Sequence, residues 1–132
     1  MPHYCVDRIA RLLNEDAKSV KGARVLILGV AYKADIDDVR ESPALLIIEQ
    51  LRKKGAVVAY HDPHVPDLGE EIEGELQSVA LTEGEIARAD CVVILTAHGA
   101  FDWPWIGQRA RLIVDTRNAM NGAAVSGTLV KA

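Results

Sequence analysis

The sequence is poor in cysteine and has no long run of apolar residues. Its two cysteines, Cys5 and Cys91, lie far apart and lack the spacing of metal ligands, so we interpret both as reduced, small core residues. The longest apolar stretches, such as 25–30 and 91–95, are far shorter than a membrane-spanning helix. The first residues also lack the charged and apolar regions of a signal peptide. The sequence therefore predicts a cytoplasmic protein with no membrane partner.

Concentrated positive charge is also missing. The chain carries 15 Lys and Arg against 19 Asp and Glu, a formal net charge of −4, and it has no basic run. This argues against nucleic acid as a partner, because binding a phosphate backbone depends on such runs. The 132 residues suffice for one domain, and the 49% of hydrophobic residues can form its core. An anionic ligand would have to be held by a few local cations and by backbone amides.

From residue 24 onward, apolar runs typical of buried parallel strands alternate with segments of helical periodicity. This alternation predicts an α/β fold: a three-layer, Rossmann-like parallel sheet with helices on both faces, preceded by one helix. We expect helices at 2–16, 43–54, 82–89 and 102–110, and strands at 24–30, 56–60, 77–80, 91–95 and 112–115. Residues 64–76 are expected to form a surface excursion, and the small, polar tail from Asn118 onward is expected to fray.

The start and end signals of the helices support these assignments. Ser42 is a good N-cap residue, Pro43 suits the first helical position, and Gly55 ends the same helix. Thr82 stands three residues before Glu85, the spacing of a capping box. In parallel sheets, ligands bind beyond the carboxyl ends of the strands. The expected binding loops are therefore 31–41, 61–66, 96–100 and 115–118.

The loop after the first strand lacks the glycines of a dinucleotide site. Such a site needs the pattern G-x-G-x-x-G, whereas segment 29–34 has one glycine, Gly29, and the chain has no P-loop either. The loop offers instead an aromatic hydroxyl (Tyr32), a mobile cation (Lys33) and a bidentate fork (Arg40). Arg117, at the end of the last expected strand, adds a cation on the same edge of the sheet.

Two interpretations of these cations remain open from spacing alone. They can converge on an anionic nucleotide, or they can pair as solvated surface ions with the acidic residues Asp35, Asp37, Asp38 and Glu41.

The other residues that could bind a ligand or a metal are expected to have structural roles. His61, Asp62 and His64 suggest a metal, but the nearby prolines favour a rigid, exposed turn, and we predict no metal site. His98 lies in a strand-end loop but is not assigned to ligand. Trp103 and Trp105 are expected to pack a short helix rather than stack on a base.

Three motifs in the right order carry a resemblance to a known family. The stretch GVAYKADIDDVRESPAL, residues 29–45, resembles the signature of the UDP-glucose/GDP-mannose dehydrogenase family at the start of its C-terminal UDP-binding domain. Residues 60–63 (YHDP) and 114–118 (VDTRN) are similar to two later motifs of that family. Residues 1–20 resemble the end of the central helical linker region that precedes this domain, which leaves 21–132 as the UDP-binding domain. The form of residues 31–33 leans slightly towards the branch that acts on UDP-N-acetylhexosamines.

The resemblance implies roles for particular residues. Tyr32, Lys33 and Arg117 match residues that bind the nucleotide sugar, and Arg40 matches an arginine that reaches the cofactor. Glu41 and Ser42 match the motif and are expected to organise the loop and cap the helix.

At the level of the whole enzyme, the family oxidises the C6 hydroxyl of a UDP-sugar to a carboxylate with two NAD and a catalytic cysteine, a reaction that serves polysaccharide biosynthesis. This chain has neither the NAD fingerprint nor the context of that cysteine, so we assign no catalytic residue. NAD is expected to bind mainly to a missing N-terminal domain, and the partners are a UDP-sugar and the rest of a homo-oligomeric dehydrogenase. Two alternatives remain: a non-catalytic nucleotide-binding regulatory module, or a stand-alone NAD-binding domain in which Asp62 holds a ribose.

Overall fold

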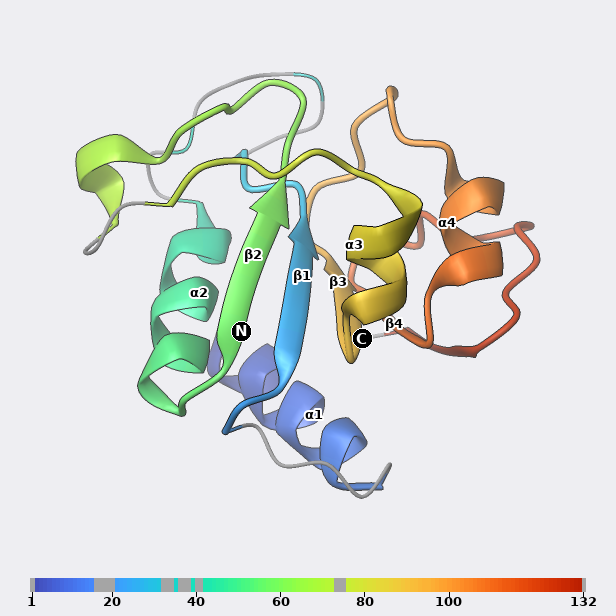
Figure 1. Cartoon of the computed structure of the whole chain (residues 1–132), viewed down its shortest axis with the longest axis horizontal. Helices are drawn as coiled ribbons and strands as arrows, with labels where there is room; N and C mark the ends of the chain where they lie inside the picture. Colours follow the sequence, from blue (N-terminus) through green and yellow to red (C-terminus); the bar gives the residue numbers. More distant parts are fainter. Residues whose placement is uncertain are drawn as a thin grey trace.

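The computed structural model describes residues 2–15, 21–31, 35, 39, 42–72 and 76–131. Its elements follow the predicted order of strands and helices (Figure 1). The helices are α1 (Pro2–Glu15), α2 (Pro43–Lys53), the 3-10 helix η1 (Gly69–Glu71), α3 (Glu83–Arg88) and α4 (Trp103–Arg109). The strands are β1 (Arg24–Leu28), β2 (Val57–His61), β3 (Cys91–Ile94), β4 (Leu112–Asp115) and β5 (Thr128–Lys131).

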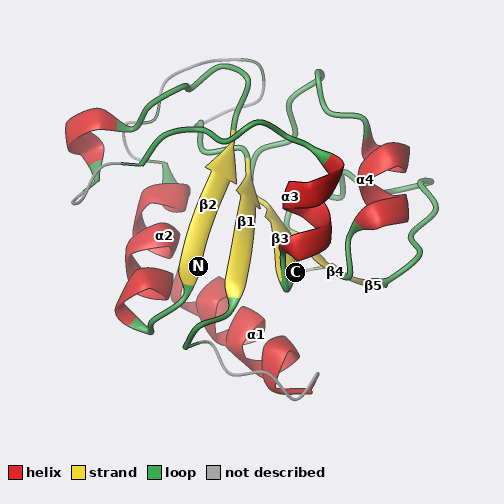
Figure 2. Ribbon diagram, in the orientation of Figure 1, coloured by secondary structure: helices red, strands yellow, loops and turns green. Residues whose placement is uncertain are grey.

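The five strands form one parallel sheet in the order β2-β1-β3-β4-β5. Val25 lies opposite Val58 on one side and opposite Cys91 on the other, so β1 is a central strand although it comes first in the chain. Helices lie on both faces, with α1 and α2 on one and α3 and α4 on the other (Figure 2). The predicted fold class is therefore confirmed.

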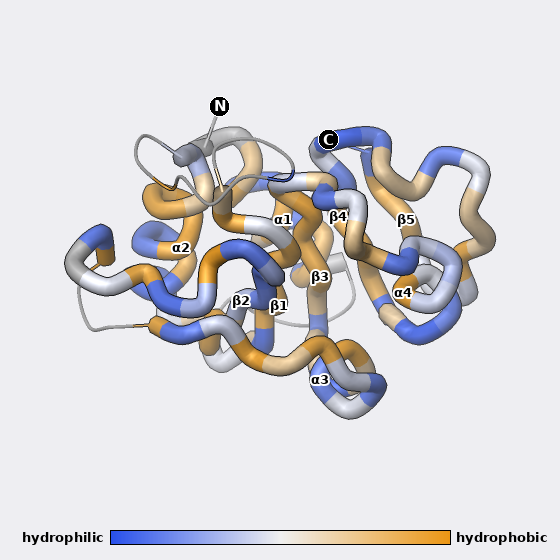
Figure 3. The backbone as a smooth tube through the Cα atoms, turned by 90° about the horizontal axis from the view of Figure 1, so that it is seen from above, coloured by the Kyte–Doolittle hydropathy of each residue, from blue (hydrophilic) through white to orange (hydrophobic). Residues whose placement is uncertain are grey.

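Alternate residues of the strands supply two separate hydrophobic cores. In β1, Val25 and Ile27 pack with α1 and α2, whereas Leu26 and Leu28 pack with α3 and α4. This alternation follows from the two-residue period of a strand, and it explains why β1 and β3 are apolar almost throughout. In the view from above, the hydrophobic strands lie between helices whose outer turns and loops are largely hydrophilic (Figure 3).

The helix signals behave as the sequence predicts. The hydroxyl oxygen of Ser42 accepts a hydrogen bond from the amide of Ala44, and Pro43 opens α2. The hydroxyl oxygen of Thr82 accepts from the amide of Glu85 at 3.2 Å. Trp103 and Trp105 are half-buried on α4 and pack against the second core, as expected.

Three expectations are wrong in detail. The tail after Asn118 does not simply fray, because Thr128–Lys131 forms β5 and pairs with all four residues of β4. The strand expected at 77–80 is reduced to isolated bridges at Gln77 and Ser78. The excursion 64–76 is partly anchored, because it buries the apolar side chains of Val65, Leu68 and Ile72 in the first core.

Helix α1 is fixed to the body of the domain. Its buried residues are Cys5, Val6, Ile9 and Leu13, which share the first core with α2 and β1. A boundary between a linker region at 1–20 and a domain at 21–132 stays a prediction. Among the described helices, none is both long and apolar enough to cross a membrane.

Candidate functional site

The loops that follow β1, β2, β3 and β4 meet at one edge of the sheet, as the parallel topology predicts (Figure 1). The loops after β1 and β2 are joined at Gly29, whose φ is +84° and whose amide donates to the carbonyl of His61 at 3.0 Å. A Cβ atom at this position would lie 2.4 Å from the carbonyl oxygen of Thr96. The hydroxyl of Thr96 donates to the carbonyl of Ala31 at 2.7 Å. The lack of a side chain at Gly29 therefore allows two loops of the protein to pack together, and it does not make room for a pyrophosphate.

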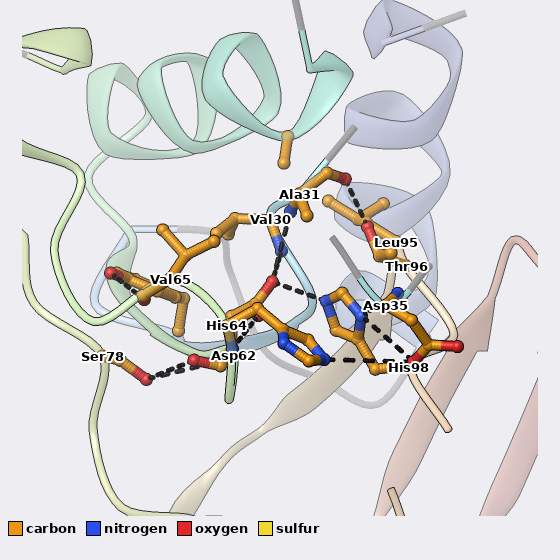
Figure 4. A network of polar contacts seen from close by, with 12 residues as sticks. Val30, Ala31, Asp35, Asp62, His64, Val65, Ser78, Leu95, Thr96 and His98 are labelled. Atoms are coloured by element: carbon orange, nitrogen blue, oxygen red, sulfur yellow. Dashed lines mark hydrogen bonds and ion pairs between the residues drawn. The ribbon is translucent and has the colours of Figure 1, made fainter. Parts of the chain in front are cut away.

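The carboxylate of Asp62 lies at the centre of this edge (Figure 4). The residue is only 2% exposed, so the sequence-based expectation of an exposed turn is wrong at this position. Its Oδ2 accepts the amides of Val30 at 2.8 Å and Ala31 at 3.2 Å, and its Oδ1 accepts the amide of His64 at 2.8 Å. Both oxygens are thus used inside the protein, which argues against the alternative in which Asp62 holds a ribose.

His98 completes the network around Asp62. The imidazole is fully buried, and its Nε2 lies 2.8 Å from Asp62 Oδ2. Its Nδ1 accepts the amide of Asp35 at 2.7 Å. Because a backbone amide can only donate, Nδ1 carries a lone pair, and the ring proton lies on Nε2 and is donated to Asp62. His98 is therefore a neutral, internal residue that cannot touch a ligand from this position.

One group of side chains here has the composition of a metal site. Ligand atoms of Asp35, His64 and His98 all lie within 4.8 Å of one another. However, His98 uses both ring nitrogens for hydrogen bonds, and Asp35 Oδ1 accepts the amide of Gly99 at 2.7 Å. A metal would have to displace the amide of Asp35 from Nδ1. This geometry gives no support to a metal site, and its absence stays a prediction.

Arg117 stands at the same edge, at the end of β4. Its amide donates to Asp115 Oδ1 at 2.9 Å, and its Nε donates to the carbonyl of Leu95 at 2.8 Å. The buried carboxylate of Asp115 also accepts the amide of Met120, which fixes the turn. Within the part of the chain that the structure describes, Arg117 forms no ion pair, and its two terminal amino groups make no hydrogen bond. An exposed guanidinium held by its Nε can present both amino groups to an anion.

The other residues predicted to bind ligand cannot be compared with the structure. Tyr32, Lys33 and Arg40 lie outside the described residues, as does Glu41. Asp62 and His98 are the part of the edge that sequence reasoning missed. Both lie in loops that follow strands, Asp62 directly after β2 and His98 in the loop after β3, and that position was the available signal.

A family model covers most of the chain. The UDP-binding domain of the UDP-glucose/GDP-mannose dehydrogenase family matches residues 26–122. The chain belongs to this family. The matched range begins in β1 and includes the loops that carry Asp62, His98 and Arg117.

Individual relatives of this UDP-binding domain agree with that assignment. The chain is 32% identical over 129 residues to a UDP-N-acetyl-D-mannosamine dehydrogenase of Methanococcus vannielii, covering 92% of this chain and 28% of the relative. It is 36% identical over 135 residues to a UDP-glucose 6-dehydrogenase of Rickettsia bellii, covering 94% and 30%. The structure of a UDP-D-ManNAc dehydrogenase from Pyrococcus horikoshii matches with a TM-score of 0.79 at 27% identity, over 98% of this chain and 30% of that one. The chain therefore spans less than a third of the length of these relatives.

Neither cysteine of the chain has the environment of a reactive thiol. Cys91 is fully buried in β3, and burial is the main cause that raises its pKa, followed by the nearby Cys5 and Asp90. Burial also raises the pKa of Cys5 on α1. Raised pKa values leave less thiolate, which is the nucleophilic form, at neutral pH.

We expect neither thiol to react with iodoacetamide at pH 7 in the folded chain, and both to react in denaturant. Burial raises the pKa of both thiols in the folded state, whereas in the unfolded chain they have the ordinary pKa of 9.0. Their contribution to stability is therefore complete below pH 9 and is lost as the pH rises further. Mass spectrometry of alkylated protein and urea unfolding between pH 7 and 10.5 measure both effects. Rapid native labelling at pH 7 would contradict the expectation.

Proposed function

We propose that this chain is the nucleotide-sugar-binding part of an NAD-dependent UDP-sugar 6-dehydrogenase, which oxidises the sugar C6 hydroxyl to a carboxylate. The observation that carries the proposal is the exposed guanidinium of Arg117, anchored through its Nε to Leu95 at the ligand-binding edge of the sheet. Tyr32 and Lys33 are proposed to bind the same nucleotide sugar. Relatives with the names UDP-N-acetyl-D-mannosamine dehydrogenase and UDP-glucose 6-dehydrogenase support a UDP-sugar as the ligand.

In the part of the chain that the structure describes, the positions where a Rossmann-type domain binds NAD are used by the protein itself. The only glycine of the first loop, Gly29, lies against Thr96, and the carboxylate that follows β2, Asp62, accepts hydrogen bonds from donors of its own protein on both oxygens. We therefore propose that NAD binds mainly to a domain outside this chain, with Arg40 reaching it from this side. The whole enzyme is proposed to be a cytoplasmic homo-oligomer that serves polysaccharide biosynthesis.

Calorimetric or NMR titration of the chain with UDP, NAD and ADP tests the proposal. We expect weak binding of UDP, no comparable binding of NAD or ADP, and no NADH production when UDP-sugar and NAD are added together. Equal affinity for NAD and UDP would favour a stand-alone dinucleotide-binding domain instead. NADH production above that of a heat-inactivated sample would show that the chain is catalytic by itself.

Replacing Arg117 with alanine should weaken UDP binding by about 10- to 100-fold, because a charge-assisted hydrogen bond contributes roughly 1.5–3 kcal/mol. The measurement is the dissociation constant from the same titration. Arg111 is a matched control, because it is also exposed but precedes β4 at the opposite edge of the sheet, 4.0 Å from Asp90. Arg111→Ala should leave the UDP affinity unchanged. If Arg117→Ala behaves like Arg111→Ala, the site assignment is wrong although the family assignment stands.

A further inference from the structure

The buried side chains of Asp62 and His98 bind the backbone at the two ends of segment 31–35, which belongs to the first loop. Asp62 Oδ2 accepts the amides of Val30 and Ala31, and His98 Nδ1 accepts the amide of Asp35 (Figure 4). The hydroxyl of Thr96 also binds the carbonyl of Ala31. Segment 31–35 is therefore attached at its first and last residue to the loops that follow β2 and β3.

The two attachments are coupled through the imidazole. His98 can accept from Asp35 only if its proton is on Nε2, and that proton is then donated to Asp62 at 2.8 Å. The end of the segment has a second contact, because the amide of Gly99 donates to Asp35 Oδ1 at 2.7 Å. Asp35 itself has a φ of +62°, a conformation that few residues adopt without support from their surroundings.

Neither Asp62 nor His98 is placed to touch a ligand. Their exposed fractions are 2% and 0%, and among the described residues their polar side-chain atoms bind to one another and to backbone amides of the protein's own loops. Between the two attached residues of the segment, the sequence contains Tyr32 and Lys33, the proposed ligands of the nucleotide sugar. A loop whose ends are already fixed loses less conformational freedom when it binds a ligand.

We propose that Asp62 and His98 are positioning residues for nucleotide-sugar binding, which act by fixing Ala31 and Asp35 at the two ends of the segment that contains Tyr32 and Lys33. This inference rests on the proposed function. On this proposal, the affinity of the exposed site for the nucleotide sugar depends on the buried pair of the Asp62 carboxylate and the His98 imidazole.

Two substitutions of His98 separate positioning from a merely structural role. His98→Asn keeps an acceptor near the place of Nδ1 and so retains the bond from the Asp35 amide, but it loses the donor to Asp62. His98→Gln keeps a donor near the place of Nε2 and so retains the bond to Asp62, but it loses the acceptor for Asp35. Each variant removes one buried hydrogen bond, so the two should lose similar thermal stability. Tyr60→Phe is the control, because it removes the buried bond from the Tyr60 hydroxyl to the Val65 carbonyl and leaves segment 31–35 untouched.

The readout is the dissociation constant for UDP, measured by NMR titration of the full chain. We expect Tyr60→Phe and His98→Asn to stay within about 3-fold of the wild type, and His98→Gln to bind about 10-fold more weakly. Ring 15N shifts should show the neutral Nε2–H tautomer of His98 in the wild type. Equal UDP affinities of the two His98 variants, or the opposite tautomer, would overturn the positioning role.

Two further outcomes are also decisive. If the wild type does not bind UDP, the proposed function fails, and the positioning role fails with it. If the His98 variants do not fold, amide hydrogen exchange of the wild type decides: UDP should slow exchange at Asp35, and unchanged exchange under saturating UDP overturns the proposal.

Discussion

Asp62→Ala should lower the free energy of unfolding by roughly 3–5 kcal/mol, because it breaks a buried hydrogen-bond network and leaves several donors unsatisfied. The substitution leaves the amides of Val30, Ala31 and His64 and the Nε2–H of His98 without their acceptor. Buried donors without partners are costly, because they have lost their hydrogen bonds to water. Urea unfolding followed by circular dichroism measures the effect.

Asp62→Asn and Asp115→Ala are graded comparisons for this prediction. An asparagine oxygen in place of Oδ2 can still accept three of the donors, and only the amide of His64 faces a donor instead. Asp115→Ala leaves two amides unsatisfied, those of Arg117 and Met120. We therefore expect both to lose less stability than Asp62→Ala. A loss below about 1 kcal/mol for Asp62→Ala would show that water replaces the carboxylate and that the network is dispensable.

Gly29→Ala should be of similar severity, with a loss of roughly 2–6 kcal/mol from backbone strain and overpacking together. The φ of +84° disfavours any residue with a Cβ atom, and that atom would lie 2.4 Å from the carbonyl oxygen and 2.5 Å from the Cβ of Thr96. The clash is with the backbone and Cβ of Thr96 in the loop that follows the neighbouring strand β3, so it cannot be relieved by turning a flexible side chain. Thermal unfolding measures the loss.

Gly22→Ala is the control that separates backbone strain from the steric clash. Gly22 has nearly the same φ, +82°, but a Cβ atom there would have no neighbour within 4 Å. This control should therefore show only the strain of the left-handed backbone, about 1 kcal/mol. If the two alanine variants are equally stable, the contact between Gly29 and Thr96 has relaxed, and the loops after β1 and β3 are less tightly joined than described.

Most of the fold could be predicted because its signals are local. Apolar runs gave β1 and β3, and Ser42, Pro43 and Gly55 gave the limits of α2. Strand β5 was missed because it is a half-buried edge strand of four residues in a small, polar tail. Its stability comes from pairing with β4, which no local pattern reveals.

The site was less predictable than the fold because it depends on strand order. The parallel topology predicts which loops share an edge, and Arg117 does lie there. Asp62 and His98 are neighbours only because β2 and β3 flank β1 on opposite sides, so that their loops meet over Gly29–Ala31. From sequence alone the two residues are 36 positions apart, and each had an ordinary explanation of its own.

The central place of β1 also has a consequence for the order of folding. Val25 pairs with Val58 on one side, but its other neighbour is Cys91, much later in the chain. During synthesis, the first strand therefore emerges with one edge that stays unpaired until β3 has left the ribosome. Its apolar side chains and free backbone groups are exposed to other nascent chains for that interval. Because long-range parallel pairing slows folding, we expect this chain to be most prone to aggregation at the stage when residues 24–90 are outside and β3 is not.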